Sequence, residues 1–449
     1  MGYIIMQFFR INKKVVLVDN YLYPRMYKYH TASEIEISPL NSTGLLILSL
    51  CDGTRDILNI VNYVSDFYDI DSELIESDIR EFLGKQIELD NVWMSDDKVF
   101  MEVPKKGRSD IIVPYLLSIE VTSKCQLKCK HCYNESGDKY YNELDWRQIV
   151  DILKQYENCG GVSVMLTGGE VFLKHGIVEI IDFACSKFLN VSIISNGYTI
   201  DEDIFRILTK WKKKIMLQIS LDGLEETHDE IRGVQGAFNK TIDNINELIR
   251  RGVHVTIGYT INEFNKFDLE ETIRYIKGLG CIGINLGTVS SIGRASTNKL
   301  DIDWNIEEFQ KLVLSLQKKY EDKQFKIVSN AEDKYERKIY PNRCGAGYKI
   351  MHLFSDGRIS LCPPSKCIAS KINLGDLKSD KLLEVLDVNN SKFVLELLSP
   401  SVEQCRHCDN ENICAGCIVN MLQNAKDDCP IIRSLQDAKI INCEREKAV

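Results

Sequence analysis

Apolar and polar residues in the first hundred positions follow patterns that predict short strands and then helices. In Ser33–Ser38 two Ile alternate with two Glu, which is typical of a strand with one buried face. Val15–Asp19 is an earlier strand-like run. Apolar residues then recur at helical spacing in three segments, 45–51, 57–64 and 74–82. These residues therefore predict a small domain with its own core.

A hairpin and a linker are expected after the third helical segment. Val92–Met94 and Val99–Met101 are apolar runs separated by a short polar turn. The stretch 104–110 is polar and basic, which favours a linker between domains. We therefore predict a winged-helix domain over residues 1–103.

Beyond the linker, strand-like runs alternate with amphipathic helical segments such as the one that carries Ile242, Ile245 and Leu248 on one face. The strand-like runs are Leu116–Val121, Val162–Leu166, Val191–Ser195, Ile215–Ser220, Val253–Thr260 and Ile282–Leu286. This alternation predicts an α/β fold in which a parallel sheet curls into a partial (βα)6 TIM-like barrel over residues 112–300. Chemistry in such folds lies at the C-terminal ends of the strands.

The remaining residues differ in composition from the barrel. Residues 301–340 read as a helical, charged bridging region, and residues 341–449 read as a Cys-rich domain of short segments. The chain as a whole is therefore expected to contain an N-terminal domain, a barrel and a C-terminal domain.

Length and charge limit the class of protein. The 449 residues exceed what a single hydrophobic core normally organises, so several domains are expected. No long apolar run predicts a membrane span, and the positive charges near the N-terminus follow the apolar run instead of preceding it, unlike in a signal peptide. A net charge of −9 argues against nucleic acid as a main partner.

The chain has 16 cysteines, and seven of them stand in closely spaced groups, at 125/129/132, 405/408 and 414/417. Without a secretion signal, this usage favours metal or cluster ligation over disulfides. We therefore expect a cytoplasmic protein with reduced thiols.

Cys125, Cys129 and Cys132 are spaced C-x3-C-x2-C directly after the first predicted barrel strand. Three thiolates leave one iron of a [4Fe-4S] cluster without a protein ligand, and the amino and carboxylate groups of S-adenosylmethionine (SAM) can chelate that iron. Reduction of such a cluster cleaves SAM to a 5′-deoxyadenosyl radical. The alternative is a zinc site, which usually takes four Cys or His ligands. His131 is a poor fourth ligand, because adjacency to Cys132 leaves it poor geometry to bind the same ion.

Residues suited to holding SAM follow later predicted strands at their C-terminal ends. They are Gly168, Gly169, Glu170, Ser195, Asn196, Ser220, Asp222 and Arg232. Glu170 could accept from the methionine amine, and the two glycines before it would let the backbone approach. Ser220 and Asp222 could bond the ribose hydroxyls, and Arg232 could pair with the methionine carboxylate. Their recurrence at successive strand ends favours a binding site over unrelated turns.

The C-terminal region holds a second group of regularly spaced cysteines. They are Cys344, Cys362, Cys405, Cys408, Cys414, Cys417 and Cys429, with Cys367 and Cys443 as spare thiols. These thiolates are enough for two further clusters, and structural zinc is the alternative for CxxC pairs.

Several motifs carry a family resemblance. They are GGEVF at 168–172, SLDG with HD and IRG at 220–233, CGAGY at 344–348 and CAGC at 414–417. With them the chain resembles the SPASM-containing radical SAM maturases of ribosomally synthesised peptides, and its N-terminal segment resembles their PqqD-like leader-recognition domain. The likeness is greatest to sactipeptide thioether synthases of the subtilosin A type.

This resemblance implies a ligand set for two auxiliary [4Fe-4S] clusters, three clusters in all with the radical one. The second auxiliary cluster would take Cys405, Cys408, Cys414 and Cys429, and the first would take Cys344, Cys362 and Cys417. The fourth ligand of the first cluster stays open between Cys367, Cys443 and the substrate.

The resemblance also implies a function. The N-terminal domain would bind a precursor peptide, an external donor of the flavodoxin or ferredoxin type would supply electrons, and a Cys sulfur would be joined to carbon as a thioether. The alternatives are another radical SAM peptide modification (carbon–carbon cross-linking, epimerisation or decarboxylation) and, in a different class, a non-catalytic Fe–S or zinc scaffold that binds peptide. Glu170 and Arg232 argue against a scaffold. A sulfatase-maturing enzyme is a further alternative. Those relatives carry an Asp after the counterpart of Cys362, and Pro363 at this position argues against that activity.

Other cysteines and histidines predict structure rather than chemistry. Cys51 and Cys185 lie on apolar helix faces, and Cys159 and Cys281 lie at loop-to-strand junctions, so we expect buried thiols. His228 is expected to be a hydrogen-bonded polar residue.

Overall fold

A computed structural model defines two compact units. The first comprises residues 1–113, 155–161 and 386–389, and the second comprises 114–154, 162–385 and 390–449. The structure describes residues 7–21, 24–31, 34–137, 142–290, 292–300, 306–329, 345–368, 372, 374–391, 417–424, 429–430 and 432–433.

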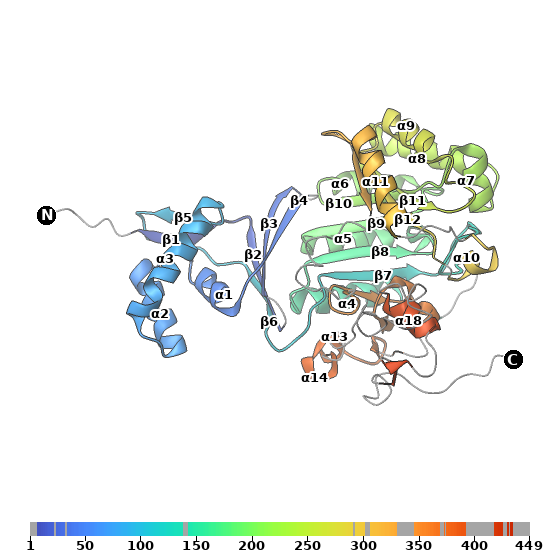
Figure 1. Ribbon diagram of the computed structural model, residues 1–449. Coiled ribbons are helices and arrows are strands. Elements are labelled where there is room, and N and C mark those ends of the chain that lie inside the picture. Colours follow the sequence, from blue (N-terminus) through green and yellow to red (C-terminus); the bar gives the residue numbers. More distant parts are fainter. Residues whose placement is uncertain are drawn as a thin grey trace. The chain divides into compact units, whose positions relative to one another are not determined.

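The first unit combines strands with a group of helices (Figure 1). Its strands are β1 (Phe8–Ile11), β2 (Val15–Asn20), β3 (Arg25–Thr31), β4 (Glu34–Pro39), β5 (Val92–Ser95) and β6 (Lys105–Arg108). Its helices are α1 (Ser42–Ser49), α2 (Ile57–Tyr68) and α3 (Ser72–Glu88). Asn41, Asp56 and Asp71 begin these helices, because each side chain accepts a backbone N–H of the first turn. The predicted helices are confirmed, and β4 contains most of the predicted alternating strand.

The predicted hairpin after α3 is wrong. Strand β5 pairs antiparallel with β1, at the start of the chain. Val99 and Met101 form no strand; their N–H groups donate to the carbonyls of Gly53 (3.1 Å) and Asp52 (2.8 Å). An extended, apolar segment thus finds its partner in a loop far away in the sequence, which local alternation cannot reveal.

The predicted linker is also wrong in part, because it contains β6. This strand pairs parallel with β2 and completes a sheet of order β4-β3-β2-β6. Lys105 forms an ion pair with Asp19 (3.4 Å), and Lys106 forms one with Glu157 (2.8 Å). An edge strand made of polar residues lacks the apolar alternation by which strands are recognised.

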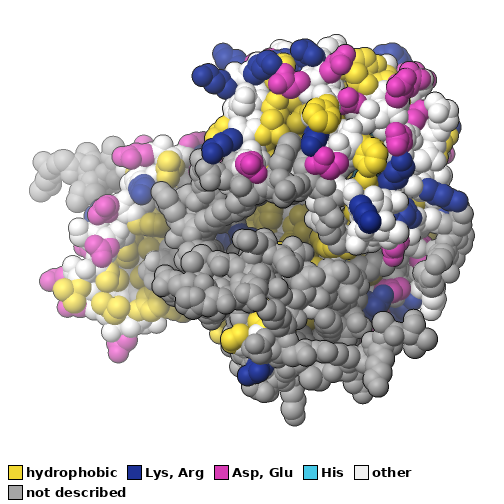
Figure 2. All heavy atoms as spheres, turned by 45° about the vertical axis from the view of Figure 1, so that its right-hand side comes forward, with side chains coloured by type: hydrophobic (Ala, Val, Ile, Leu, Met, Phe, Trp, Pro, Cys, Tyr) yellow, Lys and Arg dark blue, Asp and Glu magenta, His cyan; other side chains and the backbone are white. Residues whose placement is uncertain are grey.

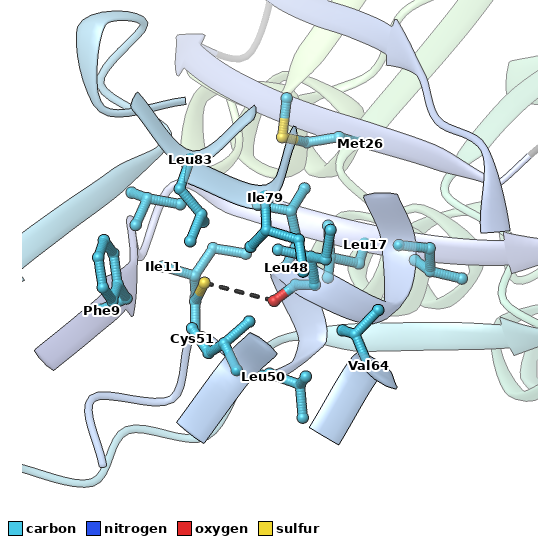
Figure 3. Packing of buried hydrophobic residues seen from close by; sticks show 14 of the residues in the cluster. Phe9, Ile11, Leu17, Met26, Leu48, Leu50, Cys51, Val64, Ile79 and Leu83 are labelled. Atoms are coloured by element: carbon cyan, nitrogen blue, oxygen red, sulfur yellow. Dashed lines mark hydrogen bonds between the residues drawn. The ribbon is translucent and has the colours of Figure 1, made fainter. Parts of the chain in front are cut away.

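The core of the first unit gathers side chains from its strands and its helices (Figure 3). The labelled members include Phe9, Ile11, Leu17, Leu48, Cys51, Ile79 and Leu83. Cys51 is fully buried, its thiol donates to the Ile47 carbonyl (3.4 Å), and burial raises its pKa. This confirms Cys51 as a core residue.

The second unit contains the predicted barrel. Its parallel strands are β7 (Leu116–Thr122), β8 (Ser163–Gly168), β9 (Asn190–Ser195), β10 (Ile215–Ser220), β11 (Val255–Ile261) and β12 (Gly283–Thr288). Each pairs in parallel with the next. The strand and helix predictions for this region are confirmed, because the strands are short runs rich in apolar residues that alternate with amphipathic helices.

Helices alternate with these strands along the chain. They are α4 (Trp146–Asn158), η1 (Val171–Leu173), α5 (Ile177–Lys187), α6 (Glu202–Lys210), α7 (Glu225–Arg232), α8 (Ala237–Arg250), α9 (Leu269–Leu279) and α10 (Arg294–Thr297). Figure 1 shows α10 near the end of the sheet toward which the arrowhead of β7 points. The C-terminal strand ends, where a site is expected, therefore lie on that side.

The sheet extends further than predicted at both edges. In the described residues its order is β13-β12-β11-β10-β9-β8-β7-β14-β15-β16. The added strands are β13 (Lys326–Ser329), β14 (Ile350–Leu353), β15 (Arg358–Ser360) and β16 (Gly375–Asp376). The bridging region was predicted to be helical. It contains the helix α11 (Ile306–Tyr320), but also strand β13, which corrects this prediction. Strand β14 pairs in parallel with β7 and so joins the C-terminal region to the barrel.

The described C-terminal residues otherwise form short elements. They are η2 (Pro363–Ile368), α13 (Leu382–Leu386), α14 (Val388–Ser391) and α18 (Ile418–Asn424). A buried cluster joins α18 to the segment before α10 through Ile292, Ile418 and Leu422.

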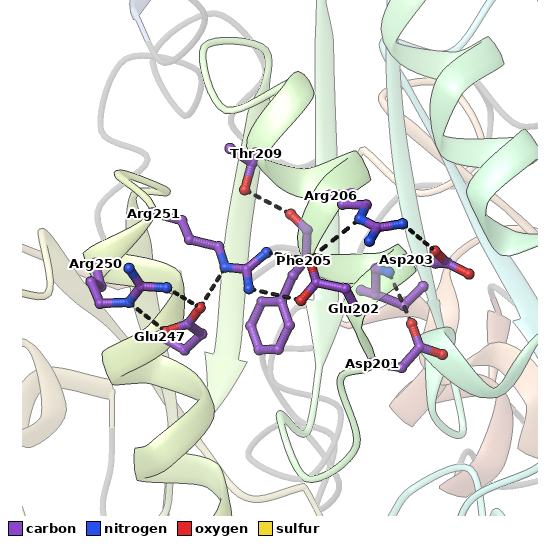
Figure 4. Close-up of polar contacts among 10 residues, drawn as sticks. Asp201, Glu202, Asp203, Phe205, Arg206, Thr209, Glu247, Arg250 and Arg251 are labelled. Carbon is purple, nitrogen blue, oxygen red and sulfur yellow. Dashed lines mark hydrogen bonds and ion pairs between the residues drawn. The ribbon is translucent and has the colours of Figure 1, made fainter.

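Ion pairs on the barrel surface link neighbouring helices (Figure 4). Arg251 follows α8 and pairs with both Glu202 of α6 (2.8 Å) and Glu247 (2.5 Å). Arg250 also pairs with Glu247 (2.6 Å). Such exposed pairs contribute little stability each, on the order of 0–1 kcal/mol. They orient the outer helices rather than hold the barrel together.

Charges of both signs are interspersed on the described part of the face in Figure 2, without a continuous basic stripe. None of the described helices combines the length and hydropathy that a membrane span requires.

The first unit offers a test of its core with a matched pair of leucines. Leu48 is fully buried, whereas Leu58 of α2 is 53% exposed. Leu48→Ala should lower the unfolding free energy of this unit by about 2–5 kcal/mol, because it leaves a cavity. Leu58→Ala should change it by less than about 0.5 kcal/mol. Hydrogen exchange of α1–α3 in the full chain measures both; equal protection in the two variants would contradict this core.

Candidate functional site

The loop that follows β7, described over residues 123–137, carries the three predicted cluster ligands and is called the cysteine loop here. Cys125 and Cys129 are buried and Cys132 is half-buried. All three thiols pack in one small cluster with Leu127, Tyr198 and Val234. The Cys125 N–H donates to the Gly137 carbonyl (3.1 Å), and the Cys132 N–H donates to the Cys129 carbonyl (3.3 Å). The loop thus folds back on itself and brings the thiols together.

Two side chains, one after strand β9 and one at the end of helix α7, approach these thiols. Asn196 Nδ2 lies 3.7 Å from Cys125 Sγ, and Arg232 Nη1 lies 3.6 Å from Cys129 Sγ. Burial raises the pKa of Cys125 to about 12 and also raises that of Cys129. Because clusters bind thiolates, assembly of a cluster here must release the protons of these thiols. The N–H donors of Asn196 and Arg232 beside the sulfur atoms favour the thiolate form.

Glu170 joins the ends of β8 and β9. Its Oε1 accepts from Ser195 Oγ (2.7 Å) and from Phe172 N (3.1 Å), and its Oε2 accepts from Asn196 N (2.8 Å). The side chain is buried, and burial raises its pKa to about 7. The carboxyl predicted to bind an amine is therefore also what positions two other predicted SAM-binding residues.

Gly168 and Gly169 allow two backbone segments of the protein to approach each other closely. Gly168 has φ +143°, a conformation that favours glycine. A Cβ on it would lie 2.3 Å from the Thr122 carbonyl oxygen, and a Cβ on Gly169 would lie 2.3 Å from the Lys124 carbonyl oxygen. These glycines therefore let the end of β8 pass directly against the start of the cysteine loop.

Asp222 and Arg232 are bound to each other. The Asp222 carboxylate is fully buried; its Oδ1 accepts from Thr260 N (2.9 Å) and its Oδ2 pairs with Arg232 (2.6 Å). His131 Nε2 lies 3.5 Å from the same Oδ2. Although burial alone would raise it, the Arg232 guanidinium holds the pKa of Asp222 below its usual value. In this structure Asp222 and Arg232 therefore bind each other, and their roles toward the ribose and the methionine carboxylate stay predictions.

The other residues of the predicted set lie nearby. Ser195 and Asn196 are buried at the end of β9, and Ser220 is half-buried at the end of β10. Asn196 Oδ1 accepts from Tyr198 N (2.8 Å) and from Gln126 Nε2 (3.3 Å), a residue of the cysteine loop. The structure thus connects Asn196, Glu170, Asp222 and the cysteine loop through direct contacts.

The expectations for structural residues are confirmed. Cys159, Cys185 and Cys281 are buried. His228 is buried, its Nδ1 accepts from Asp222 N (3.2 Å), and burial lowers its pKa to about 3. His228 is therefore neutral and holds the backbone of the Asp222 turn.

Sequence reasoning missed Arg294. Its guanidinium donates from Nε to the Cys129 carbonyl (2.8 Å) and from Nη1 to the Ser136 carbonyl (3.0 Å). The sequence contained one signal for it. Arg294 follows the sixth barrel strand, and the predicted site residues likewise follow the C-terminal ends of other strands.

The C-terminal ligand set is described only in part. Cys344, Cys405, Cys408, Cys414 and Cys443 lie outside the described residues, as does the side chain of Cys367. Cys362, Cys417 and Cys429 are half-buried. Cys362 and Cys417, both predicted for the first auxiliary cluster, contact the same buried hydrophobic group.

The described residues fit a cluster with one open iron. Among them no three His, Cys, Asp or Glu side chains converge as a single metal ion would require. A [4Fe-4S] cluster instead offers a separate iron to each thiolate, and three gathered thiols supply three of its four ligands.

Solved structures and curated proteins resemble this chain over most of its length. The Streptococcus suis protein SuiB, solved bound to S-adenosylmethionine, shares the fold with a TM-score of 0.67 at 16% identity, covering 94% of this chain and 100% of that one. The antilisterial bacteriocin subtilosin biosynthesis protein AlbA of Bacillus subtilis (strain 168) is 24% identical over 88% of this chain and 87% of its own length. The sporulation killing factor maturation protein SkfB of the same organism is 26% identical over 62% of this chain and 66% of its own length.

Three family models match successive parts of the chain. Residues 35–89 match coenzyme PQQ synthesis protein D (PqqD), residues 119–276 match the Radical SAM superfamily, and residues 344–417 match the iron–sulfur cluster-binding domain SPASM. The Radical SAM match spans β7 to α9 and contains the whole cysteine loop. The chain is therefore a radical SAM enzyme that also carries a PqqD domain and a SPASM domain.

Proposed function

We propose that this enzyme matures a ribosomally synthesised peptide by joining Cys sulfur to carbon in thioether cross-links. The observation that carries the proposal is the combination of PqqD, radical SAM and SPASM domains in one chain that aligns with 87% of the subtilosin biosynthesis protein AlbA. A chain that only bound peptide would not need the radical site.

The proposed radical site is the loop of Cys125, Cys129 and Cys132, which would hold a [4Fe-4S] cluster. When bound, the cluster and SAM supply a 5′-deoxyadenosyl radical that takes a hydrogen atom from the peptide. Arg232 and Asn196 already lie beside two of the thiols, which supports their role in stabilising the thiolates.

For SAM itself we propose Gly168, Gly169, Glu170, Ser195, Asn196, Ser220, Asp222 and Arg232 as the binding set. Glu170 would receive the methionine amine, because a cation beside this buried carboxyl would favour its charged form. The mutual pairing of Asp222 and Arg232 supports a positioning role for both, and Arg232 Nε, which has no hydrogen-bond partner in the described residues, could donate to the methionine carboxylate.

For the auxiliary clusters we propose the ligands that the family resemblance implies. Cys344, Cys362 and Cys417 would hold one, and Cys405, Cys408, Cys414 and Cys429 the other. The shared packing of Cys362 and Cys417 supports their assignment to one cluster.

The PqqD domain would bind the leader of the precursor peptide. Strand β4 is at the edge of its sheet in the described residues, so it can accept an extended peptide as a further strand. A cavity of about 430 Å³ lies between α1, α2 and α3 and is lined mainly by apolar side chains, among them Ile47, Val64, Ile75 and Phe82. Such a cavity suits an apolar anchor of the leader.

We propose a cytoplasmic reaction with electrons from a flavodoxin or ferredoxin type of donor, since the many thiols need a reducing compartment. For the leader domain, barrel, bridging region and SPASM domain we propose the limits 1–103, 112–300, 301–340 and 341–449. Two strands beyond the leader-domain and barrel limits complete neighbouring sheets: β6 joins the sheet of the first unit, and β13 joins that of the barrel.

The buried Glu170 predicts a pH dependence of the protein without cluster or SAM. Its pKa is about 7 when folded and near 4.5 otherwise. The folded state therefore keeps a proton that the unfolded state releases, so stability is full below pH 4.5 and falls as pH rises to 7, by on the order of 3 kcal/mol. Relative to Glu170→Gln, the wild type should lose stability between pH 5 and 8 in urea unfolding.

Glu247 on the surface of α8 provides the control for this pH series. Arg250 and then Arg251 lower its pKa to about 2, so it does not titrate between pH 5 and 8. Glu247→Gln should run parallel to the wild type. A Glu170→Gln curve that also runs parallel would mean that Glu170 is ionised in the folded protein.

The proposed leader cavity can be tested with two exposed aliphatic residues of the same domain. Ile70 lines the cavity, whereas Leu58 does not. Ile70→Asp should weaken binding of the precursor peptide about tenfold or more, because a charge would be buried under the peptide. Leu58→Asp should bind normally, and SAM cleavage without peptide should be unchanged in both. Equal peptide affinity of the two variants would exclude this cavity.

The proposed bond predicts the mass and reactivity of the product. Forming C–S breaks one C–H and one S–H bond: one hydrogen atom goes to the deoxyadenosyl group, one proton to solvent, and one electron to an acceptor such as an auxiliary cluster. The peptide should become lighter by about 2 Da per bridge, and the bridged Cys should no longer react with iodoacetamide. Carbon–carbon coupling gives the same mass with a reactive thiol, epimerisation gives no mass change, and decarboxylation removes about 44 Da.

A further inference from the structure

A short segment after β12 holds the backbone of the cysteine loop. Arg294 makes three hydrogen bonds to that loop: its N–H to the Cys132 carbonyl (3.1 Å), Nε to the Cys129 carbonyl (2.8 Å) and Nη1 to the Ser136 carbonyl (3.0 Å). Asn298 Nδ2 adds a fourth, to the Lys130 carbonyl (2.9 Å). Arg294 of α10 and Asn298, the residue that follows this helix, thus bind carbonyls at several positions of the loop that carries the radical-site thiols.

Gly293 makes this close approach possible. It has φ +58° and ψ −136°, a conformation that L side chains rarely adopt. A Cβ at this position would lie 2.6 Å from the Tyr133 carbonyl oxygen and 2.7 Å from that of Cys132. The backbone before Arg294 therefore lies directly against the end of the cysteine loop.

The preceding residue faces the SPASM side of the same unit. Ile292 is buried in a hydrophobic cluster with Leu361, Ile418 and other residues, against which Cys362 and Cys417 also pack. Residues 292 and 294 therefore contact, respectively, the surroundings of a proposed auxiliary site and the loop of the radical site.

We propose that Arg294 is a positioning residue for the radical cluster, which holds the cysteine loop in its cluster-binding shape and ties it to the auxiliary side through Ile292. A guanidinium offers a planar set of donors, which suits Arg294 to holding two carbonyls at once. Its fixed positive charge beside the loop also favours the more negative, reduced form of the cluster. The inference rests on the radical site of this enzyme and not on the nature of the peptide product.

Two substitutions separate the geometric effect from the charge effect. Arg294→Lys keeps the charge but not the paired donors, and Arg294→Gln loses both. In anaerobically reconstituted full-length protein, both variants should lose radical-site iron to a chelator about tenfold faster than the wild type, while auxiliary iron is held normally. Only Arg294→Gln should lower the reduced fraction of the radical cluster at a fixed potential, by about tenfold, or about 59 mV for a one-electron couple.

The radical cluster is followed by the change of its electron paramagnetic resonance signal on addition of SAM, which distinguishes it from the auxiliary clusters. Arg250→Gln, at an exposed site on α8, is the matched control and should behave as the wild type in each measurement. If Arg294→Gln binds no iron at the radical site but retains auxiliary iron, the proposal is supported. If Arg294→Gln binds no iron at all, Arg294→Lys provides the test, and a loss of radical-site iron about tenfold faster than in the wild type then supports the proposal. Wild-type chelation rates in Arg294→Lys, or in both variants, would overturn the proposal.

Discussion

The arrangement of the site depends on the buried ion pair between Asp222 and Arg232. A charge without water is costly unless it is paired and hydrogen-bonded. Asp222 meets this requirement with Arg232 from the end of α7 and with the backbone of Thr260 in β11. Arg232 then reaches Cys129, and His131 of the same loop approaches Asp222. Removing either charge would leave the other unpaired, so the helix, the strand ends and the cysteine loop are fixed together.

A second carboxyl acts in a similar way on the other side of the loop. Glu170 accepts three hydrogen bonds that bind the ends of β8 and β9, and Asn196, which it orients, lies beside Cys125. Each of these two thiols is therefore approached by a polar side chain that a buried acid holds in place. Contacts among the protein's own residues thus hold this part of the site in place, which helps to control a reactive radical.

The barrel could be predicted because its strands are short runs rich in apolar residues that alternate with amphipathic helices; in β9, for example, Val191 and Ile193 are fully buried. It missed β6, where Lys105, Lys106 and Arg108 leave no apolar pattern, and β13, a short strand after a charged helix. Spacing and strand order identified the cysteines and most polar residues of the site. They could not show that Asp222 and Arg232 bind each other, or that Arg294 reaches the loop, because these contacts depend on the folded geometry.

The pairing of β14 with β7 has a consequence for electron transfer. These strands belong to one hydrogen-bonded sheet, so the described start of the SPASM region is a continuation of the barrel and not a separately tethered body. Electron tunnelling rates fall exponentially with distance, and a connection through a sheet keeps distances nearly constant during turnover. In the proposed reaction, this sheet would therefore keep the path of the electron toward the SPASM region the same from one peptide to the next.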